Sequence, residues 1–337
     1  MREPRFASLA AVLERKRPER PVLYELFLND TLYSRLGGRE LDDRTDKLTR
    51  LVTIAAAMRK AGYDYAPTVA NEFAFPVGEF HSLKTISLNE GHAITDRESF
   101  KKYPWPDPDA FDYSSLTEAA GRLPEGMKVV ILGPCGVLEN IVRIVGFDRL
   151  CFMLADDAGL AGDIFEAIGS RLLRYYKRCL EHDTVGAVVG NDDWGFKTQT
   201  MLSPADMRKY VFPWHRKIVG AAHEAGRPAI LHSCGNLREV MDDVIDDMKY
   251  DGKHSYEDII QPVEEAYGEY SPRIAIMGGI DMDFLCRSTP DEVKRRSRGM
   301  LARSAKRGAY ALGTGNSVPE YIPEENYFAM TSVALES

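Results

Sequence analysis

The sequence lacks long hydrophobic runs: no apolar stretch in its 337 residues approaches the ~20 residues that a membrane-spanning helix needs. The N-terminal segment also lacks the extended apolar core and small-residue cleavage site of a secretory signal. Excess positive charge is missing too, because 51 Asp and Glu outnumber 43 Lys and Arg, giving a formal net charge of −8. This balance argues against nucleic acid or an anionic membrane as the main partner.

Paired cysteines are equally absent. The five cysteines stand at positions 135, 151, 179, 234 and 286, without the spacing of a disulfide framework. Free thiols suit a reducing compartment, so we expect a cytoplasmic protein. The chain also has no low-complexity segment, Gly/Ser linker or short tandem repeat. We therefore expect residues 1–337 to form one domain.

Predicted strands and helices instead alternate along the chain. Short β-rich runs with polar or Gly-containing ends occur at 21–27, 63–71, 127–136, 186–192, 228–235, 250–257, 273–281 and 308–316. Amphipathic helical patterns lie between most of them, as at 42–63, 158–182, 203–226 and 288–308. Several of these patterns open with Ser, Thr or Asp, which are good N-cap residues.

Strands that alternate with helices predict parallel βαβ units. Eight such units in a chain of this length predict a closed (β/α)₈ TIM barrel. A helix at about residues 5 to 16 is expected to precede the first strand and to cover the lower end of the barrel. An open doubly wound sheet is the alternative, but the Gly-rich dinucleotide-binding turn typical of that fold is absent.

Polar and reactive residues follow nearly every predicted strand. Because the active site of such a barrel lies at the C-terminal ends of its strands, these residues are expected to converge on one cleft, as in an enzyme. They are Glu25, Asn71, Glu72, Cys135, Asn191, Asp192, Asp193, His232, Cys234, Lys253, His254, Glu257, Asp281, Thr314 and Asn316.

His232 and Cys234 stand out among them. Residues two apart on a strand point to the same face, so both side chains can reach one metal ion. Zinc accepts imidazole nitrogen and thiolate sulfur, and a catalytic zinc keeps one position open for substrate. The alternative is a buried cysteine packed as a small hydrophobe beside a hydrogen-bonded histidine.

The adjacent carboxylates Asp192 and Asp193 allow two interpretations. They can serve a turn or a helix N-cap, or an active site, and Asp192 is the stronger site candidate. Asp281 has the same two alternatives, a helix cap or a ligand contact. His254, at a strand end, is a candidate metal ligand or base.

Other reactive residues are expected to pack rather than react. His215 and His223 lie within a predicted helix, Cys151 and Cys179 fall on helical faces, and Cys286 follows a predicted strand at a helix start.

The order of motifs resembles the uroporphyrinogen decarboxylase superfamily, which also contains corrinoid-dependent methyltransferases. The resemblance covers most of the chain after residue 127 and implies a (β/α)₈ barrel. The matching stretches are "LGPCGVLENIVRIVGFDRL", "NDDWGFKTQTMLSPADMRKYVFPWHRKIV", "ILHSCGNLREVMDDVID", "IAIMGGIDMDFLCRSTPDEV" and "ALGTGNSVPEYIPEEN".

Departures from the family patterns favour the methyltransferase branch. True decarboxylases carry an arginine-rich segment after the first strand, and this chain has Glu25 there. They also carry a histidine in an L-G-H-G pattern after the last strand, and this chain has Thr314 at that position. The methyltransferases bind zinc through an H-x-C pair, matched by His232 and Cys234, and a later cysteine, whose place falls at Asn316. Candidates to complete a zinc site are His254, Glu257, Asp281, Glu25 and Cys286.

The resemblance implies a methyltransferase that moves a methyl group between a small one-carbon donor or acceptor and a corrinoid, free or on a partner protein. Zinc on His232 and Cys234 would activate the nucleophile or leaving group. The alternatives are a uroporphyrinogen-type decarboxylase and a non-catalytic ligand-binding barrel. Predicted catalytic residues are Asp192, His254 and Asp281. Predicted substrate contacts are Glu25, Asn71, Asn191, Glu257, Thr314 and Asn316.

Overall fold

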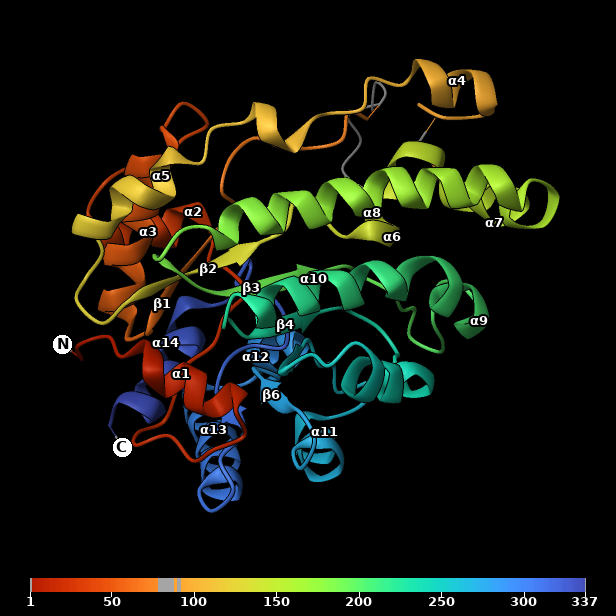
Figure 1. Cartoon of the computed structure of the whole chain (residues 1–337). Coiled ribbons are helices and arrows are strands. Elements are labelled where there is room, and N and C mark those ends of the chain that lie inside the picture. Colours follow the sequence, from red (N-terminus) through yellow and green to blue (C-terminus); the bar gives the residue numbers. More distant parts are fainter. Residues whose placement is uncertain (1, 78–87, 90–91, 337) are drawn as a thin grey trace.

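The computed structural model describes residues 2–77, 88–89 and 92–336, which form a curled parallel sheet surrounded by helices (Figure 1). Each of the seven strands pairs in parallel with the next along the chain. The strands are β1 (Tyr65–Thr68), β2 (Lys128–Leu132), β3 (Val185–Asn191), β4 (Ala229–His232), β5 (Gly252–His254), β6 (Ala275–Met277) and β7 (Tyr310–Ala311). The predicted alternation of strands and helices is thus confirmed.

Helices fill most of the chain between and after the strands. They are α1 (Phe6–Leu13), α2 (Asp30–Gly37), α3 (Lys47–Ala61), α4 (Arg97–Lys102), α5 (Ser114–Glu118), α6 (Val137–Val145), α7 (Phe147–Asp156), α8 (Ala158–Leu180), α9 (Pro204–Asp206), α10 (Phe212–Glu224), α11 (Val263–Tyr270), α12 (Met282–Arg287), α13 (Pro290–Ser304) and α14 (Glu324–Leu335). Figure 1 shows α8 and α10 running side by side along β2, β3 and β4. Within the described part of the chain, no helix is both long and apolar enough to span a bilayer.

Capping residues define where these helices begin and end. Asp46 accepts a hydrogen bond from the amide of Thr49 at the start of α3 (2.9 Å), and Gly62 ends that helix with a φ of +93°. Thr289 and Glu292 form a capping box at the start of α13. Side-chain acceptors satisfy amides that a helix N-terminus leaves unpaired, and glycine adopts positive φ without strain.

The predicted first strand, 21–27, is not formed as a regular strand. Leu23 makes one parallel bridge to Leu312 beside β7. On the other side, the hydroxyl of Tyr65 hydrogen-bonds both the amide and the carbonyl of Glu25, where a ladder to β1 would run. Pro67 in β1 has no N–H to give to such a ladder. The sheet therefore has seven paired strands, and a complete eight-stranded barrel is not confirmed.

The predicted N-terminal helix is confirmed as α1, and it lies against the N-terminal ends of the strands. Its Phe6 packs against Gly186 at the start of β3, and Leu13 packs against Gly252 at the start of β5. The two ends of the described chain also meet, because Arg2 donates to the carbonyl of Ala334 (3.4 Å). Helix α1 therefore covers the N-terminal end of the sheet and leaves the C-terminal end uncovered.

Candidate metal centre

Three possible metal ligands meet at the C-terminal end of the sheet. His232 ends β4, Cys234 follows two residues later, and Asp193 lies two residues beyond β3. Nε2 of His232 is 3.8 Å from Sγ of Cys234 and 3.8 Å from Oδ1 of Asp193, and the three donor atoms all lie within 4.8 Å of one another. Tetrahedral zinc with bonds of about 2.0–2.3 Å needs donors about 3.3–3.8 Å apart. The nitrogen, sulfur and oxygen donors of this Asp193–His232–Cys234 triad therefore fit zinc.

The loops after β3 and β4 are hydrogen-bonded to each other, which fixes the spacing of the triad. The amide of Cys234 donates to Oδ1 of Asp193 (2.8 Å), and the amide of Gly195 donates to the carbonyl of Cys234 (3.2 Å). Gly235 has a φ of +85°, and a Cβ there would overlap the Gly195 carbonyl. Glycine at this position lets the two loops approach closely enough to hold the ligands together.

His232 contacts a second buried histidine. Its Nδ1 lies 2.8 Å from Nδ1 of His254, whose Nε2 is 3.1 Å from the carbonyl oxygen of Thr314. Burial and the charge of Lys253 lower the pKa of His232 to about 3. Burial also holds the pKa of His254 well below its usual range, and His232 adds to the effect. Both rings are therefore neutral near pH 7, which is the form of imidazole that binds a metal.

Cys234 has polar neighbours around its sulfur. Nδ2 of Asn316 donates to Sγ at 3.2 Å, and Oγ of Ser255 lies 3.7 Å away. The amide of Ser317 donates to Oδ1 of Asn316 (2.7 Å), so the nitrogen of the Asn316 amide faces the sulfur. Burial and the Asp193 charge raise the pKa of the free thiol to about 12. Cys234 is therefore a thiol unless a cation stabilises its thiolate.

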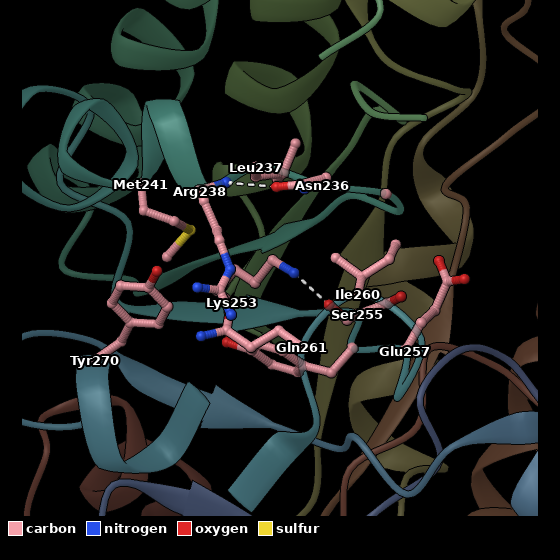
Figure 2. Close-up of a pocket in the computed structure, with 12 residues that line it drawn as sticks. Asn236, Leu237, Arg238, Met241, Lys253, Ser255, Glu257, Ile260, Gln261 and Tyr270 are labelled. Carbon is pink, nitrogen blue, oxygen red and sulfur yellow. Dashed lines mark hydrogen bonds between the residues drawn. The ribbon is translucent and has the colours of Figure 1, made fainter. Parts of the chain in front are cut away.

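A small pocket beside Cys234 is lined by Lys253 and Glu257 (Figure 2). The room inside it is about 20 Å³, enough for one water molecule. Lys253 is 4% exposed, contacts the carbonyl of Ser255 and lies over the ring of Tyr256, 4.1 Å from its centroid. Burial lowers the pKa of Lys253 to about 8, against the raising effect of Cys234 and the nearby carboxylates. A buried cation therefore stands near the sulfur of Cys234.

Asp192 points away from the triad into a closed network. Its carboxylate accepts from the amides of Leu138 (3.0 Å) and Glu139 (2.9 Å) at the start of α6. Nε2 of His215 lies 3.0 Å from Oδ2, and Nδ1 of that ring is 2.7 Å from the hydroxyl of Tyr250. Asp192 has no exposed surface. The structure thus places this predicted catalytic residue at a helix N-terminus rather than in the triad.

Glu25 and Asn191 are also bonded inside the protein. The carboxyl group of Glu25 accepts from the amide of Thr314 (2.8 Å) and is hydrogen-bonded to the Thr314 hydroxyl (2.5 Å), and burial raises its pKa to about 8. Oδ1 of Asn191 accepts from the amide of Gly133 at 2.7 Å. These predicted substrate contacts join neighbouring strand ends to one another.

Asn71 and Asp281 serve local turns and caps. Oδ1 of Asn71 accepts from the amide of Phe73 at 3.1 Å. Asp281 caps α12 by accepting from the amide of Phe284 (2.9 Å), and its other oxygen accepts from the amide of Asp258 (2.9 Å). Across residues 2–77, 88–89 and 92–336, the triad is the one group of three His, Cys, Asp or Glu donors close enough to share an ion.

Several residues around this site make contacts that their residue types alone do not predict. Asp193 was the weaker carboxylate candidate, yet it faces His232 and Cys234. His215 was expected only to pack, yet it bonds Asp192. Glu139 was not singled out, although burial and the charges of Asp192 and Asp193 raise its pKa to about 8. The adjacent Asp-Asp pair was the available signal, since neighbouring residues leave a strand end in opposite directions.

A comparison with models of known protein families matches most of this chain to one of them. The model of the family described as uroporphyrinogen decarboxylase (URO-D) matches residues 84–336. The chain belongs to the URO-D family. A comparison with curated protein sequences finds no match for this URO-D family member.

Solved structures with a similar course of the chain include the two that follow. A methyltransferase from Methanosarcina mazei is 14% identical, with 98% of this chain and 97% of that chain aligned and a TM-score of 0.70. A putative vitamin-B12 independent methionine synthase from Listeria monocytogenes is 10% identical, with 100% and 98% aligned and a TM-score of 0.48. The first of these likenesses shows a shared fold.

Proposed function

We propose that this URO-D family member is a zinc-dependent methyltransferase that moves a methyl group between a small one-carbon donor or acceptor and a corrinoid. The observation that carries the proposal is the Asp193–His232–Cys234 triad at the open end of the sheet. Three protein ligands leave a fourth position for substrate, as in catalytic zinc sites. Bound zinc would act as a Lewis acid that lowers the pKa of a substrate thiol or hydroxyl.

The side chains around the triad would prepare it for that role. The N–H of Asn316 and the positive charge of Lys253 offset the negative charge on the Cys234 sulfur once its proton is lost. Asn316, which lies beside the Cys234 sulfur, and Glu257, which lines the small pocket, remain proposed substrate contacts. For Asp192 and Asp281, whose oxygens accept backbone amide hydrogens, we propose a structural role in holding the loops.

Exposed apolar side chains support a corrinoid, free or carried by a partner protein, as the second substrate. Three large ones lie in the segments that follow β3, β5 and β7, at the end of the sheet that carries the triad, and each is at least 38% exposed: Phe196, Ile259 and Tyr321. Exposed apolar side chains that gather at one end of a protein are typical of interaction surfaces. We expect Ile259→Asp to raise KM for methylcobalamin and to leave zinc content unchanged.

Zinc content tests the proposal most directly. We expect about one zinc per chain in the purified protein and almost none in Cys234→Ala, because loss of a thiolate ligand weakens the site. Cys286→Ala is the matched control, since Cys286 is exposed on α12. Demethylation of methylcobalamin with small thiols, followed by absorbance, then tests the reaction. Wild-type protein that stays metal-free after incubation with zinc would exclude this mechanism and favour the alternatives.

Decarboxylation of a uroporphyrinogen-type substrate is the second candidate, because the matching family is named for that reaction. In that mechanism Asp192 would stabilise a protonated intermediate, but both of its oxygens are bonded inside the protein. Release of CO₂ from uroporphyrinogen by metal-free protein would favour this candidate. Ligand binding without turnover in both assays would favour a non-catalytic barrel.

A further inference from the structure

His254 lies behind His232, on the side away from the other two triad residues. We propose that His254 is a positioning residue: it accepts a hydrogen bond from Nδ1–H of His232 and so leaves the Nε2 lone pair of His232 facing Asp193 and Cys234. This role deepens the proposed zinc chemistry and rests on it for its function. It assigns His254 neither proton transfer nor direct contact with the ion.

The carbonyl of Thr314 fixes the proton on His254. Nε2 of His254 lies 3.1 Å from that carbonyl oxygen, which can only accept a hydrogen bond. Nε2 must therefore carry the proton. In a neutral ring the other nitrogen, Nδ1, is then a bare acceptor.

The two Nδ1 atoms, 2.8 Å apart, share one hydrogen bond. A second proton on His254 would create a cation with no exposed surface, and no carboxylate forms an ion pair with it among the described residues. That arrangement is unfavourable because burial destabilises an unpaired charge. The proton in the bond therefore belongs to Nδ1 of His232.

This tautomer of His232 also leaves Nε2, the nitrogen that faces Asp193 and Cys234, free to bind a metal ion. With its proton on Nδ1, neutral His232 has a lone pair on Nε2, the atom that is 3.8 Å from both Sγ of Cys234 and Oδ1 of Asp193. A histidine that ligates a metal through one nitrogen commonly donates its other N–H to a fixed acceptor, which orients the ring. His254 supplies that acceptor here.

Neighbouring residues hold the His254 ring in this position. Gly278, with a φ of +68°, leaves room for the ring, since a Cβ there would lie 3.0 Å from Nε2 and would overlap the Thr314 carbonyl. The ring of Tyr24 contacts His254 edge to face, with centroids 5.3 Å apart. Glu25 binds both the amide and the hydroxyl of Thr314. The acceptor chain is thus anchored on the ends of β6 and β7 and on the segment that carries Tyr24 and Glu25.

Nitrogen-15 NMR of histidine-labelled, metal-free protein tests the tautomer directly. We expect the wild type to show His232 protonated on Nδ1 and bare on Nε2. His254→Leu should lose this preference, and its zinc Kd in chelator competition should rise by about 10- to 100-fold. His254→Asn should stay within about threefold of the wild type, because its amide oxygen can replace the lost acceptor.

Tyr24→Phe is the matched control. It keeps the ring that packs on His254 and removes a hydroxyl without a hydrogen-bond partner among the described residues, so tautomer and zinc Kd should not change. Unfolding midpoints show whether each variant folds, and the wild-type spectrum tests the tautomer without any variant. A wild type with the tautomer but no zinc binding would overturn the proposed function and support the positioning role. A proton on Nε2 of His232, or unchanged zinc affinity in folded His254→Leu, would overturn the positioning role.

Discussion

Asp192 and Asp193 are chemically identical neighbours with opposite surroundings. Asp192 has no exposed surface, and its carboxylate meets two amides of α6 and the ring of His215. Asp193 has a side chain that is 43% exposed and faces His232 and Cys234. Successive side chains leave a strand end on opposite sides, so a single step along the chain separates a structural carboxylate from a candidate ligand.

The comparison teaches that a carboxylate can be recognised as a ligand only when its other partners are known. The helix N-terminus and His215 already satisfy Asp192, since amides and the positive end of a helix dipole favour negative charge. Asp193 has one amide partner, that of Cys234, and it retains oxygen lone pairs for an ion. The predictions below separate these two kinds of carboxyl group, in order of expected effect.

Asp192→Ala should lower the free energy of unfolding by about 3–5 kcal/mol, because it leaves His215 and two helix amides without their buried partner. Denaturant unfolding measures the change. Asp193→Ala, measured in parallel, should lower stability by less than about 1 kcal/mol, as usual for a partly exposed group. Equal losses in the two variants would contradict the distinction.

Glu25 should make stability fall as pH rises. Burial raises its pKa from 4.5 to about 8 in the folded protein. Below pH 4.5 the carboxyl is protonated in both states, and between 4.5 and 8 only the unfolded chain releases the proton, which favours unfolding. The free energy of unfolding should therefore fall by about 1.4 kcal/mol per pH unit within this window and lose nothing more above it.

Glu25→Gln should remove that contribution, because an amide can keep both bonds to Thr314 without a titrating proton. Denaturant unfolding at pH 5, 6 and 7 compares the slopes of the two proteins. The variant should match the wild type near pH 5 and exceed its stability at pH 7. Parallel pH profiles would show that Glu25 is ionised in the folded protein.

Asp193→Ala should weaken zinc binding by at least about tenfold, since a site with three protein ligands loses one of them. Chelator competition gives the Kd, and Asp206→Ala is a matched control on a half-buried carboxylate at α9. If Asp193→Ala retains wild-type affinity, a different residue supplies the oxygen ligand.

Asp281→Ala should have the smallest effect, a loss of about 1 kcal/mol, the usual contribution of an N-cap. The variant loses the cap of α12 and the bond to the Asp258 amide. Zinc affinity and methylcobalamin turnover should stay at wild-type values. A selective loss of turnover at unchanged stability would instead support the catalytic role predicted from the sequence.

Most of the fold was predictable because strand and helix patterns are local. The apolar run ending at His232 and the caps at Asp46 and Thr289 could be recognised from residue types alone. The missing regular strand at 21–27 could not, because it depends on where the hydroxyl of Tyr65 lies in three dimensions.

The sequence predicts a candidate metal centre, but it predicts only some of the residues that form it. His232 and Cys234 share a strand face, so their proximity follows from spacing alone, and Asn316 does lie beside the sulfur. Asp193 and His254 could not be assigned in this way. Their roles depend on which neighbouring strand end they face, and strand spacing alone does not specify that.

The close approach of Gly195 and Gly235 has a consequence for ion selectivity. The loops that carry Asp193 and Cys234 are tied by peptide hydrogen bonds, so they cannot easily move apart to suit a larger ion. Calcium needs six to eight oxygen ligands at about 2.3–2.6 Å, and magnesium keeps an octahedral shell of oxygen ligands. A narrow site with nitrogen and sulfur donors would disfavour both ions. The two glycines would thus help the chain to exclude the abundant hard cations of a cell.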